Sequence, residues 1–233
     1  MRKIVQIIII VLLQFLIPLN LIGQEFEWYE FELENIKIDF PSEEVYQLDT
    51  IVNGSRLNQL YNQIRNSTLL IQKTSAEKIS KDNDLSSLPY DYESLIKYYD
   101  GFINGVKNST NGEKVEKEEI KNGELIGIEY IIYNEIENPI ILSQVFLAGN
   151  DIIALSVYNP DKELDEINDI FFDSVNFENL DSFEQFTGDS KAYKLGYLLG
   201  KLIFYIILGI GIVLSIANST FAIDGCDFNT VDG

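Results

Sequence analysis

The stretch Lys114–Tyr158, KVEKEEIKNGELIGIEYIIYNEIENPIILSQVFLAGNDIIALSVY, decides the fold of this 233-residue chain. Apolar and polar residues alternate along much of it, and Asn122-Gly123 and Gly149-Asn150 interrupt the pattern. Such pairs favour tight hairpin turns, because the turn residues adopt positive φ. We therefore predict an antiparallel meander that forms the middle of a sheet. Its four strands are expected at Lys114–Lys121, Glu124–Tyr133, Ile140–Ala148 and Asp151–Tyr158.

Upstream of the meander, alternating patterns predict five further strands. Phe26–Phe40 reads as two short strands with a turn at Asn35. Asn53-Gly54 predicts a second hairpin because its sequence fits a type I′ turn. The strands on its two sides and the one that follows are expected at Val45–Val52, Ser55–Asn62 and Ser67–Thr74.

Two helices are predicted on either side of the meander. Asp91 can cap a helix over Tyr92–Lys107, and Gly101 and Gly105 are expected to allow it to pack closely on the sheet. The apolar stripe of this helix is Tyr92, Leu95, Tyr99, Phe102, Ile103 and Val106. Asn159 is expected to cap the second helix, with Pro160 at its first position. The stripe of the second helix is Leu164, Ile167, Phe171 and Val175.

This order of elements over Phe26–Phe177 resembles the PsbP/Mog-like superfamily. The short motifs of the resemblance are Phe40-Pro41, Gly127-Ile128-Glu129 and Ser174-Val175. The longer matching stretches are IDFPSE (Ile38–Glu43), YESLIKYYDGFINGV (Tyr92–Val106), ELIGIEYIIYNE (Glu124–Glu135), VFLAGNDIIALSVYNP (Val145–Pro160) and IFFDSVNF (Ile170–Phe177). The resemblance implies an α+β fold, an antiparallel sheet between helices in an α/β/α sandwich. It also implies a non-catalytic role, because most members of the superfamily are not enzymes, although fold alone does not fix function.

Residues 1–23 have the pattern of a secretory signal peptide. Arg2 and Lys3 form its positive start, an apolar run follows, and Pro18 ends that run before Gly23. Leu21 is larger than the usual residue at its position before a cleavage site, so an uncleaved signal anchor is the alternative. The domain that follows, residues 24–177, is accordingly expected outside the cytoplasm.

Residues 192–217 are predicted to form a transmembrane helix, with Lys201 near one interface. Gly196 and Gly200 are spaced for close helix contact, which suggests a homodimer through this helix. Residues 178–191 form an acidic tether and residues 218–233 a short tail. The tail contains only acidic charges, whereas lysines precede the span. The positive-inside rule therefore favours the domain side in the cytoplasm, while the signal peptide favours the domain outside.

The composition excludes several classes of site. The chain has no histidine and one cysteine, Cys226, which rules out histidine-based catalysis and thiolate metal clusters in the domain. We expect no cofactor and no metal. The net charge of −20 disfavours nucleic-acid binding, because the surface repels phosphate. Abundant Ile, Asn, Tyr, Glu and Lys are typical of AT-rich bacterial genomes.

Together these features predict a single-pass protein of the bacterial cytoplasmic membrane, not an enzyme. Its domain would face the periplasm or the exterior and bind a protein, peptide or lipid. The alternatives are a structural subunit of an envelope assembly and a glycan hydrolase that uses two carboxylates. Because the tether contains few apolar groups, residues 24–180 are expected to fold alone.

Overall fold

The computed structural model describes residues 26–52, 55–75, 88–177, 185–186 and 196–201. Its main layer is a seven-stranded sheet in which every neighbouring pair is antiparallel. In spatial order the strands are β3 (Tyr46–Val52), β4 (Ser55–Ile64), β5 (Ser67–Ser75), β9 (Asp151–Tyr158), β8 (Pro139–Ala148), β7 (Leu125–Tyr133) and β6 (Lys114–Asn122). The predicted meander is confirmed, and it forms the half of the sheet from β9 to β6.

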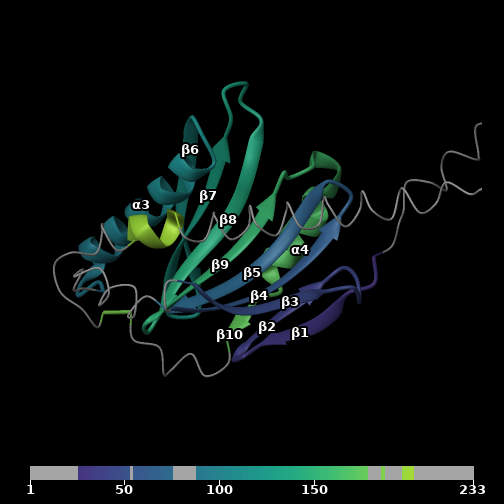
Figure 1. Ribbon diagram of the computed structural model, residues 1–233, viewed down its shortest axis with the longest axis horizontal. Helices are drawn as coiled ribbons and strands as arrows, with labels where there is room; N and C mark the ends of the chain where they lie inside the picture. The colour runs from purple at the N-terminus through teal and green to yellow at the C-terminus, as the bar shows by residue number, and fades with distance from the viewer. Residues whose placement is uncertain (1–25, 53–54, 76–87, 178–184, 187–195, 202–233) are drawn as a thin grey trace, which may run out of the picture.

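A second, three-stranded sheet lies beside the first (Figure 1). The predicted pair at the N-terminal end of the domain forms β1 (Tyr29–Leu33) and β2 (Ile36–Phe40), which are antiparallel. The third strand is β10 (Asn176–Phe177), which pairs with β2 near Ile36 and Lys37. The sequence analysis did not predict β10, because two residues are too short to show an alternating pattern.

The helix α3 (Tyr92–Ser109) begins where its capping pattern predicts. The Asp91 carboxylate accepts a hydrogen bond from the Ser94 backbone N–H at 2.8 Å, and the Ser94 hydroxyl accepts one from the Asp91 backbone N–H at 3.0 Å. Most of the predicted stripe is buried. Tyr92 is the exception: its side chain is 52 % exposed, and its hydroxyl donates to Glu119 at the surface.

The second helix starts later than the sequence predicts. Asn159 donates its backbone N–H to Ile140 O and has a φ of 50°, so it prolongs the β8–β9 pairing and then turns the chain. Asp161 caps the short 3₁₀ turn η2 (Lys162–Leu164) instead, and α4 (Asp165–Asp173) follows it. The prediction that Asn159 caps this helix is therefore wrong.

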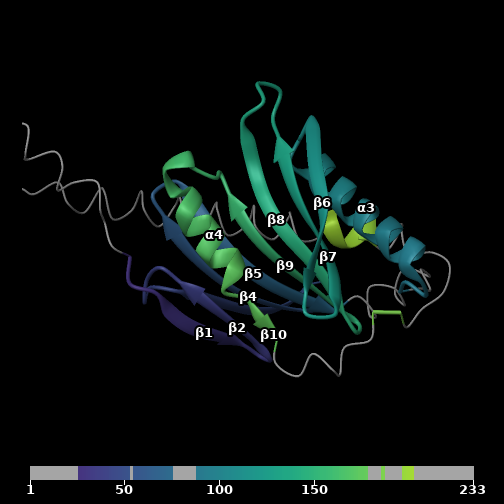
Figure 2. The ribbon, with the colours of Figure 1, turned by 180° about the vertical axis from the view of Figure 1, so that it is seen from behind.

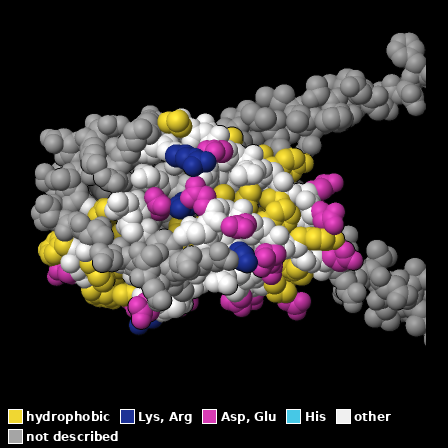
Figure 3. All heavy atoms as spheres, turned by 90° about the horizontal axis from the view of Figure 1, so that it is seen from below, with side chains coloured by type: hydrophobic (Ala, Val, Ile, Leu, Met, Phe, Trp, Pro, Cys, Tyr) yellow, Lys and Arg dark blue, Asp and Glu magenta, His cyan; other side chains and the backbone are white. Residues whose placement is uncertain are grey.

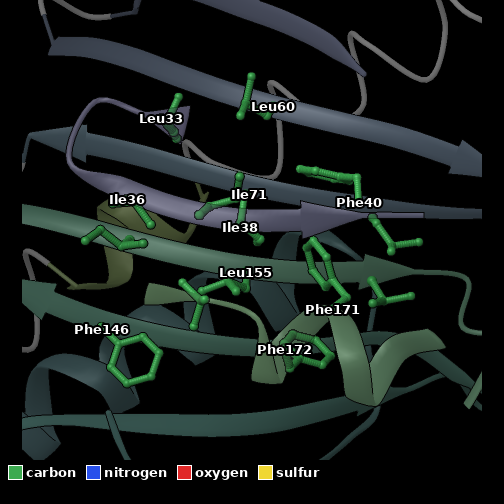
Figure 4. Packing of buried hydrophobic residues seen from close by; sticks show 14 of the residues in the cluster. Leu33, Ile36, Ile38, Phe40, Leu60, Ile71, Phe146, Leu155, Phe171 and Phe172 are labelled. Carbon is green, nitrogen blue, oxygen red and sulfur yellow. The ribbon is translucent and has the colours of Figure 1, made fainter. Parts of the chain in front are cut away.

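The two helices cover opposite faces of the large sheet (Figures 1 and 2). The cluster around α3 contains residues of β7, β8 and β9. In it, Phe102 and Tyr130 are in edge-to-face contact with ring centroids 6.4 Å apart, within the range of about 4.5–7 Å typical of such pairs. The cluster around α4 lies on the other face and joins both sheets. In Figure 4, Phe40 of β2 and Phe171 of α4 lie together, with ring centroids 5.4 Å apart.

This arrangement confirms an antiparallel α+β fold. Among the described residues, no helix is long and apolar enough to cross a membrane. The predicted signal peptide, the short tail and most of the predicted transmembrane helix lie outside the described residues, which include only its positions 196–201.

A charged cluster joins the β1–β2 turn to the large sheet. Glu34, at the turn with a φ of 58°, accepts hydrogen bonds from Lys73 of β5 and from the Asn58 amide at 2.5 Å. Lys73 also lies 3.2 Å from Asp151. Chiefly because Lys73 donates to it, Glu34 has a pKa below its ordinary value of 4.5.

Glu34→Gln is expected to reduce the loss of stability in acid. A carboxyl whose pKa is lower in the folded state stabilises the fold above its ordinary pKa of 4.5, and this contribution disappears as the pH falls through the folded-state value. The free energy of unfolding in urea should therefore fall less between neutral and acidic pH in Glu34→Gln than in the wild type. Glu32→Gln, an exposed neighbour, is the control. An equal fall in the free energy of unfolding in the wild type, Glu34→Gln and Glu32→Gln would contradict this role of Glu34.

Candidate functional site

The α3 side of β4 and β5 differs from the rest of that face of the sheet. Residues directly opposite each other on paired strands point to the same face. Gln72 lies opposite Ala154, which packs in the α3 cluster, and Gln59 lies opposite Gln72. We call the side chains of this region the amide face. Its members are Leu57, Gln59, Leu70, Gln72 and Thr74.

The two glutamines form a short directional chain of hydrogen bonds. The Gln59 amide donates to the Gln72 carbonyl oxygen at 2.6 Å, and the Gln72 amide lies 3.4 Å from the Thr74 hydroxyl. The Gln59 side-chain oxygen is buried and has no hydrogen-bond partner among the described residues. Buried polar atoms are nearly always paired, because an unpaired acceptor costs about 1–3 kcal/mol. The amide face therefore contains one unpaired buried acceptor.

The amide face is buried, although α3 does not extend over it. Gln59 and Gln72 are 0 % exposed, and Leu57 and Leu70 are 1 % and 3 % exposed. The apolar cluster around α3 includes no residue of β3, β4 or β5, and Leu57 and Leu70 belong to neither large cluster. Figure 1 shows α3 over the β6–β7 side of the sheet, away from β3 and β4. This region is consequently buried without a contribution from α3.

Hydroxyl groups continue the polar row from the amide face toward α3. Ser156 of β9 lies opposite Leu70, and its hydroxyl lies 2.8 Å from that of Ser143 on β8. Burial raises the pKa of Tyr130, and a hydrogen bond with Ser143 partly offsets this rise. Burial likewise raises the pKa of Tyr158. These phenols stay protonated at neutral pH, so they serve as hydrogen-bonding groups and not as bases.

Gln185, which lies within the predicted tether, is buried against the domain. Gln185 is 6 % exposed, and its amide donates to Leu147 O at 2.8 Å and to Ile126 O at 2.9 Å. Its carbonyl oxygen accepts from the Ile126 backbone N–H at 2.9 Å. The Tyr99 hydroxyl, which donates to Ile126 O and accepts from the Leu147 N–H, completes the same cluster. Gln185 is thus held by β7, β8 and α3.

Gly196 and Gly200 lie against α3 of the same chain. Residues 196–201 are helical, and Leu199 is 0 % exposed within the α3 cluster. A Cβ atom on Gly196 would overlap the carbonyl oxygen of Tyr98, and one on Gly200 would overlap that of Phe102. Gly105 faces the same contact rather than the sheet, since its Cβ would overlap Tyr197 O. The predicted close-contact glycines therefore bring two backbones together within one chain.

Gly200→Leu is expected to force residues 196–201 away from α3. The added side chain meets backbone atoms, which cannot rotate away, so we expect a loss of about 1–3 kcal/mol in the free energy of unfolding. Urea unfolding followed by circular dichroism measures this loss. Lys201→Leu, which adds the same side chain at a partly exposed position, is the control. If the two variants are equally stable, the glycine contact does not hold the segment.

Two shallow pockets lie elsewhere on the surface. One of about 250 Å³ lies on β6 and β7 and is lined by Glu116, Lys117, Glu118, Glu129, Tyr130 and Ile131. The other, of about 580 Å³, lies near the start of β1 and the end of β4. No Asp or Glu among the described residues is buried, and no group of three or more potential metal ligands occurs there. Figure 3 shows acidic side chains spread over the surface rather than gathered in one site.

Comparison with known proteins gives a single structural similarity. No protein-family model and no curated protein sequence matches the chain. The chain is similar to the solution structure of cyanobacterial PsbP (CyanoP) from Synechocystis sp. PCC 6803 at 12 % sequence identity. The match covers 66 % of this chain and 96 % of that chain, with a TM-score of 0.42. The α+β assignment rests on the sheets and helices of this chain itself.

Proposed function

We propose that the chain is a single-pass, membrane-anchored protein of the bacterial envelope. Its PsbP/Mog-like domain would lie on the periplasmic or extracellular side of the cytoplasmic membrane and act as a non-catalytic binding module. The signal-peptide pattern of residues 1–23 and the uncharged run Leu202–Ala217 support the anchored topology.

The observation that carries the binding role is the unpaired acceptor of the amide face, a face that is buried in the free chain and that a partner would reach only when it opens. Leu57 and Leu70 are apolar and buried. The side-chain oxygen of Gln59, whose amide donates to Gln72, adds one unpaired acceptor. A matching partner is an apolar polypeptide segment that carries a hydroxyl or N–H donor, since that donor would pair the acceptor. The proposed partner is therefore a protein or peptide. Specific binding of a lipid in the test below would replace this proposal.

The attachment of the C-terminal chain supports a fixed position for the domain. Gln185 and residues 196–201 both dock near α3, and Lys201 directly precedes the proposed anchor. An anchor that leaves from a docked segment holds α3 close to the bilayer.

The topology is tested in cells of the source bacterium. Alkaline carbonate should leave the full chain in the membrane pellet, and protease added to spheroplasts should degrade the domain. Leu208→Glu combined with Ile212→Glu, which places two charges in the apolar run, should release the chain into the soluble fraction. Extraction of the wild-type chain by carbonate, or protection of the domain from external protease, would contradict the proposal.

The binding role is tested with the detergent-solubilised full chain. Proteins captured from solubilised envelopes should be lost with Gln59→Leu, which removes the free acceptor, and retained with the exposed Glu32→Gln. Equal capture by both variants would exclude the amide face, and specific capture of lipid would replace the peptide partner. A discrete large complex in blue-native electrophoresis would instead indicate a structural subunit.

The glycan-hydrolase alternative requires two carboxyl groups that face each other across a cleft. Among the described residues no buried carboxylate pair occupies such a position. No observation favours this alternative over the binding role.

A further inference from the structure

We infer that the pocket near the start of β1 and the end of β4 is a binding site for a primary ammonium group on an alkyl chain. Such a group ends a lysine side chain or a free alkylamine. The pocket has a volume of about 580 Å³, within the range of about 300–1,000 Å³ typical of small-molecule sites. The inference goes beyond the proposed function, because this pocket and the amide face share no residue.

Two glutamates from different parts of the chain meet in this pocket at one tyrosine hydroxyl. The Tyr29 hydroxyl of β1 donates to the Glu27 carboxylate at 2.5 Å. This hydrogen bond, together with the charges of Glu27 and of Glu43 in the bend after β2, raises the pKa of Tyr29 to about 12. One hydroxyl proton leaves most acceptor positions of the two carboxylates unused. Because carboxylates close to each other repel, a cation between them would be stabilising.

The described part of the chain supplies no cation to these carboxylates. Arg65 alone is basic among the described residues that line the pocket. Its guanidinium donates to Glu163 at 2.7 Å and lies 3.8 Å from Asp161, so its charge is already paired. Among the described residues no lysine or arginine forms an ion pair with Glu27 or Glu43. The pocket therefore attracts a cation.

Asn62 adds a buried acceptor to the residues that line the pocket. Its side chain is 3 % exposed, and its amide donates to Glu44 O at 2.7 Å, which fixes the side chain against the bend after β2. The Asn62 Oδ1 atom is buried and has no hydrogen-bond partner among the described residues. Buried acceptors are nearly always paired, so this atom favours a ligand that carries N–H donors.

A primary ammonium group fits these acceptors better than a metal ion does. It carries three N–H donors, which match in number the acceptor groups of Glu27, Glu43 and Asn62. A calcium ion takes about six to eight oxygen ligands. The described residues include no group of three or more Asp, Glu, His or Cys side chains that could hold a metal. The rings of Phe26 and Tyr29, which also line the pocket, can contact the cation and its alkyl chain.

Isothermal titration calorimetry of the detergent-solubilised full chain tests the site. Lysine blocked at its α-amino and carboxyl groups represents a polypeptide, and pentylamine represents a free amine. Pentyltrimethylammonium has the same charge as pentylamine but no N–H donor. The double variant Glu27→Gln, Glu43→Gln removes both carboxylates of the pocket. Glu30→Gln combined with Glu32→Gln, which removes two exposed carboxylates of β1, is the matched control.

We expect the amines to bind the wild type and the control equally, and to bind Glu27→Gln, Glu43→Gln at least about tenfold more weakly. Pentyltrimethylammonium should also bind the wild type at least about tenfold more weakly than pentylamine, since it cannot donate to the acceptors of the pocket. This second comparison uses the wild-type chain alone, so it tests the site even if the double variant fails to fold.

The relative affinities of the two amines identify the source of the ammonium group. Tighter binding of blocked lysine would indicate a polypeptide, and tighter binding of pentylamine a free amine, while equal binding supports the shared chemistry. The inference is overturned if neither amine binds, if the amines bind both double variants equally, or if pentyltrimethylammonium binds as tightly as pentylamine.

Discussion

Phe102→Ala is expected to lower the free energy of unfolding by about 3–5 kcal/mol. Phe102 is 0 % exposed, its ring packs edge-to-face on Tyr130, and its backbone carbonyl faces Gly200. Removal of the ring leaves a cavity between α3 and β7.

Urea unfolding of the chain from Gln24 to Lys201 measures this loss. Phe186→Ala removes the same ring at a position that is 45 % exposed, and it should change stability by about 1 kcal/mol or less. Equal effects of the two substitutions would show that the face of α3 that carries Phe102 is not the core of this layer.

Gln185→Leu is expected to cost about 2–4 kcal/mol, from two backbone groups that lose their partners. Leucine has nearly the same volume, but it cannot accept from the Ile126 N–H or donate to Leu147 O. Both backbone groups would remain beneath the tether without water. Thermal unfolding should show a lower midpoint and no loss of secondary structure at low temperature.

The exposed Gln63→Leu is the matched control and should leave the midpoint nearly unchanged. A Gln185→Leu protein as stable as this control would mean that the tether does not depend on its glutamine for docking.

The hairpins and α3 could be predicted because their signals are local. Turn residues such as Asn122-Gly123 fix the strand ends, and the Asp91–Ser94 pair fixes the start of α3. The strand β10 and the late start of α4 depend on contacts with distant residues, so local patterns did not indicate them. Asparagine is a common helix-capping residue, but the hydrogen bond from the Asn159 backbone N–H to Ile140 O keeps Asn159 in the hairpin.

The amide face could not be predicted from single-strand patterns. Polar residues occur on both faces of β4, and only the pairing of Gln59 with Gln72 shows that two amides meet in the interior. Gln185 lies in a polar stretch without periodicity, so its burial was equally hidden.

The glycine spacing carries a local signal whose partner helix the sequence does not specify. The spacing of Gly196 and Gly200 indicates close backbone contact, but spacing does not identify the other helix. The structure brings these glycines against Tyr98 and Phe102, and it places Gly105 in the same contact. Gln185 and Leu199 are buried, so the stability of residues 24–180 alone remains a prediction to be measured.

The central claim is that Gln185 and residues 196–201 contribute to the stability of the folded domain. The most direct test compares the free energies of unfolding in urea of residues 24–201 and residues 24–180. We predict that the shorter chain is less stable by at least about 3 kcal/mol, since it loses the Gln185 hydrogen bonds and the burial of Leu199. Equal free energies of unfolding for the two chains would contradict the claim.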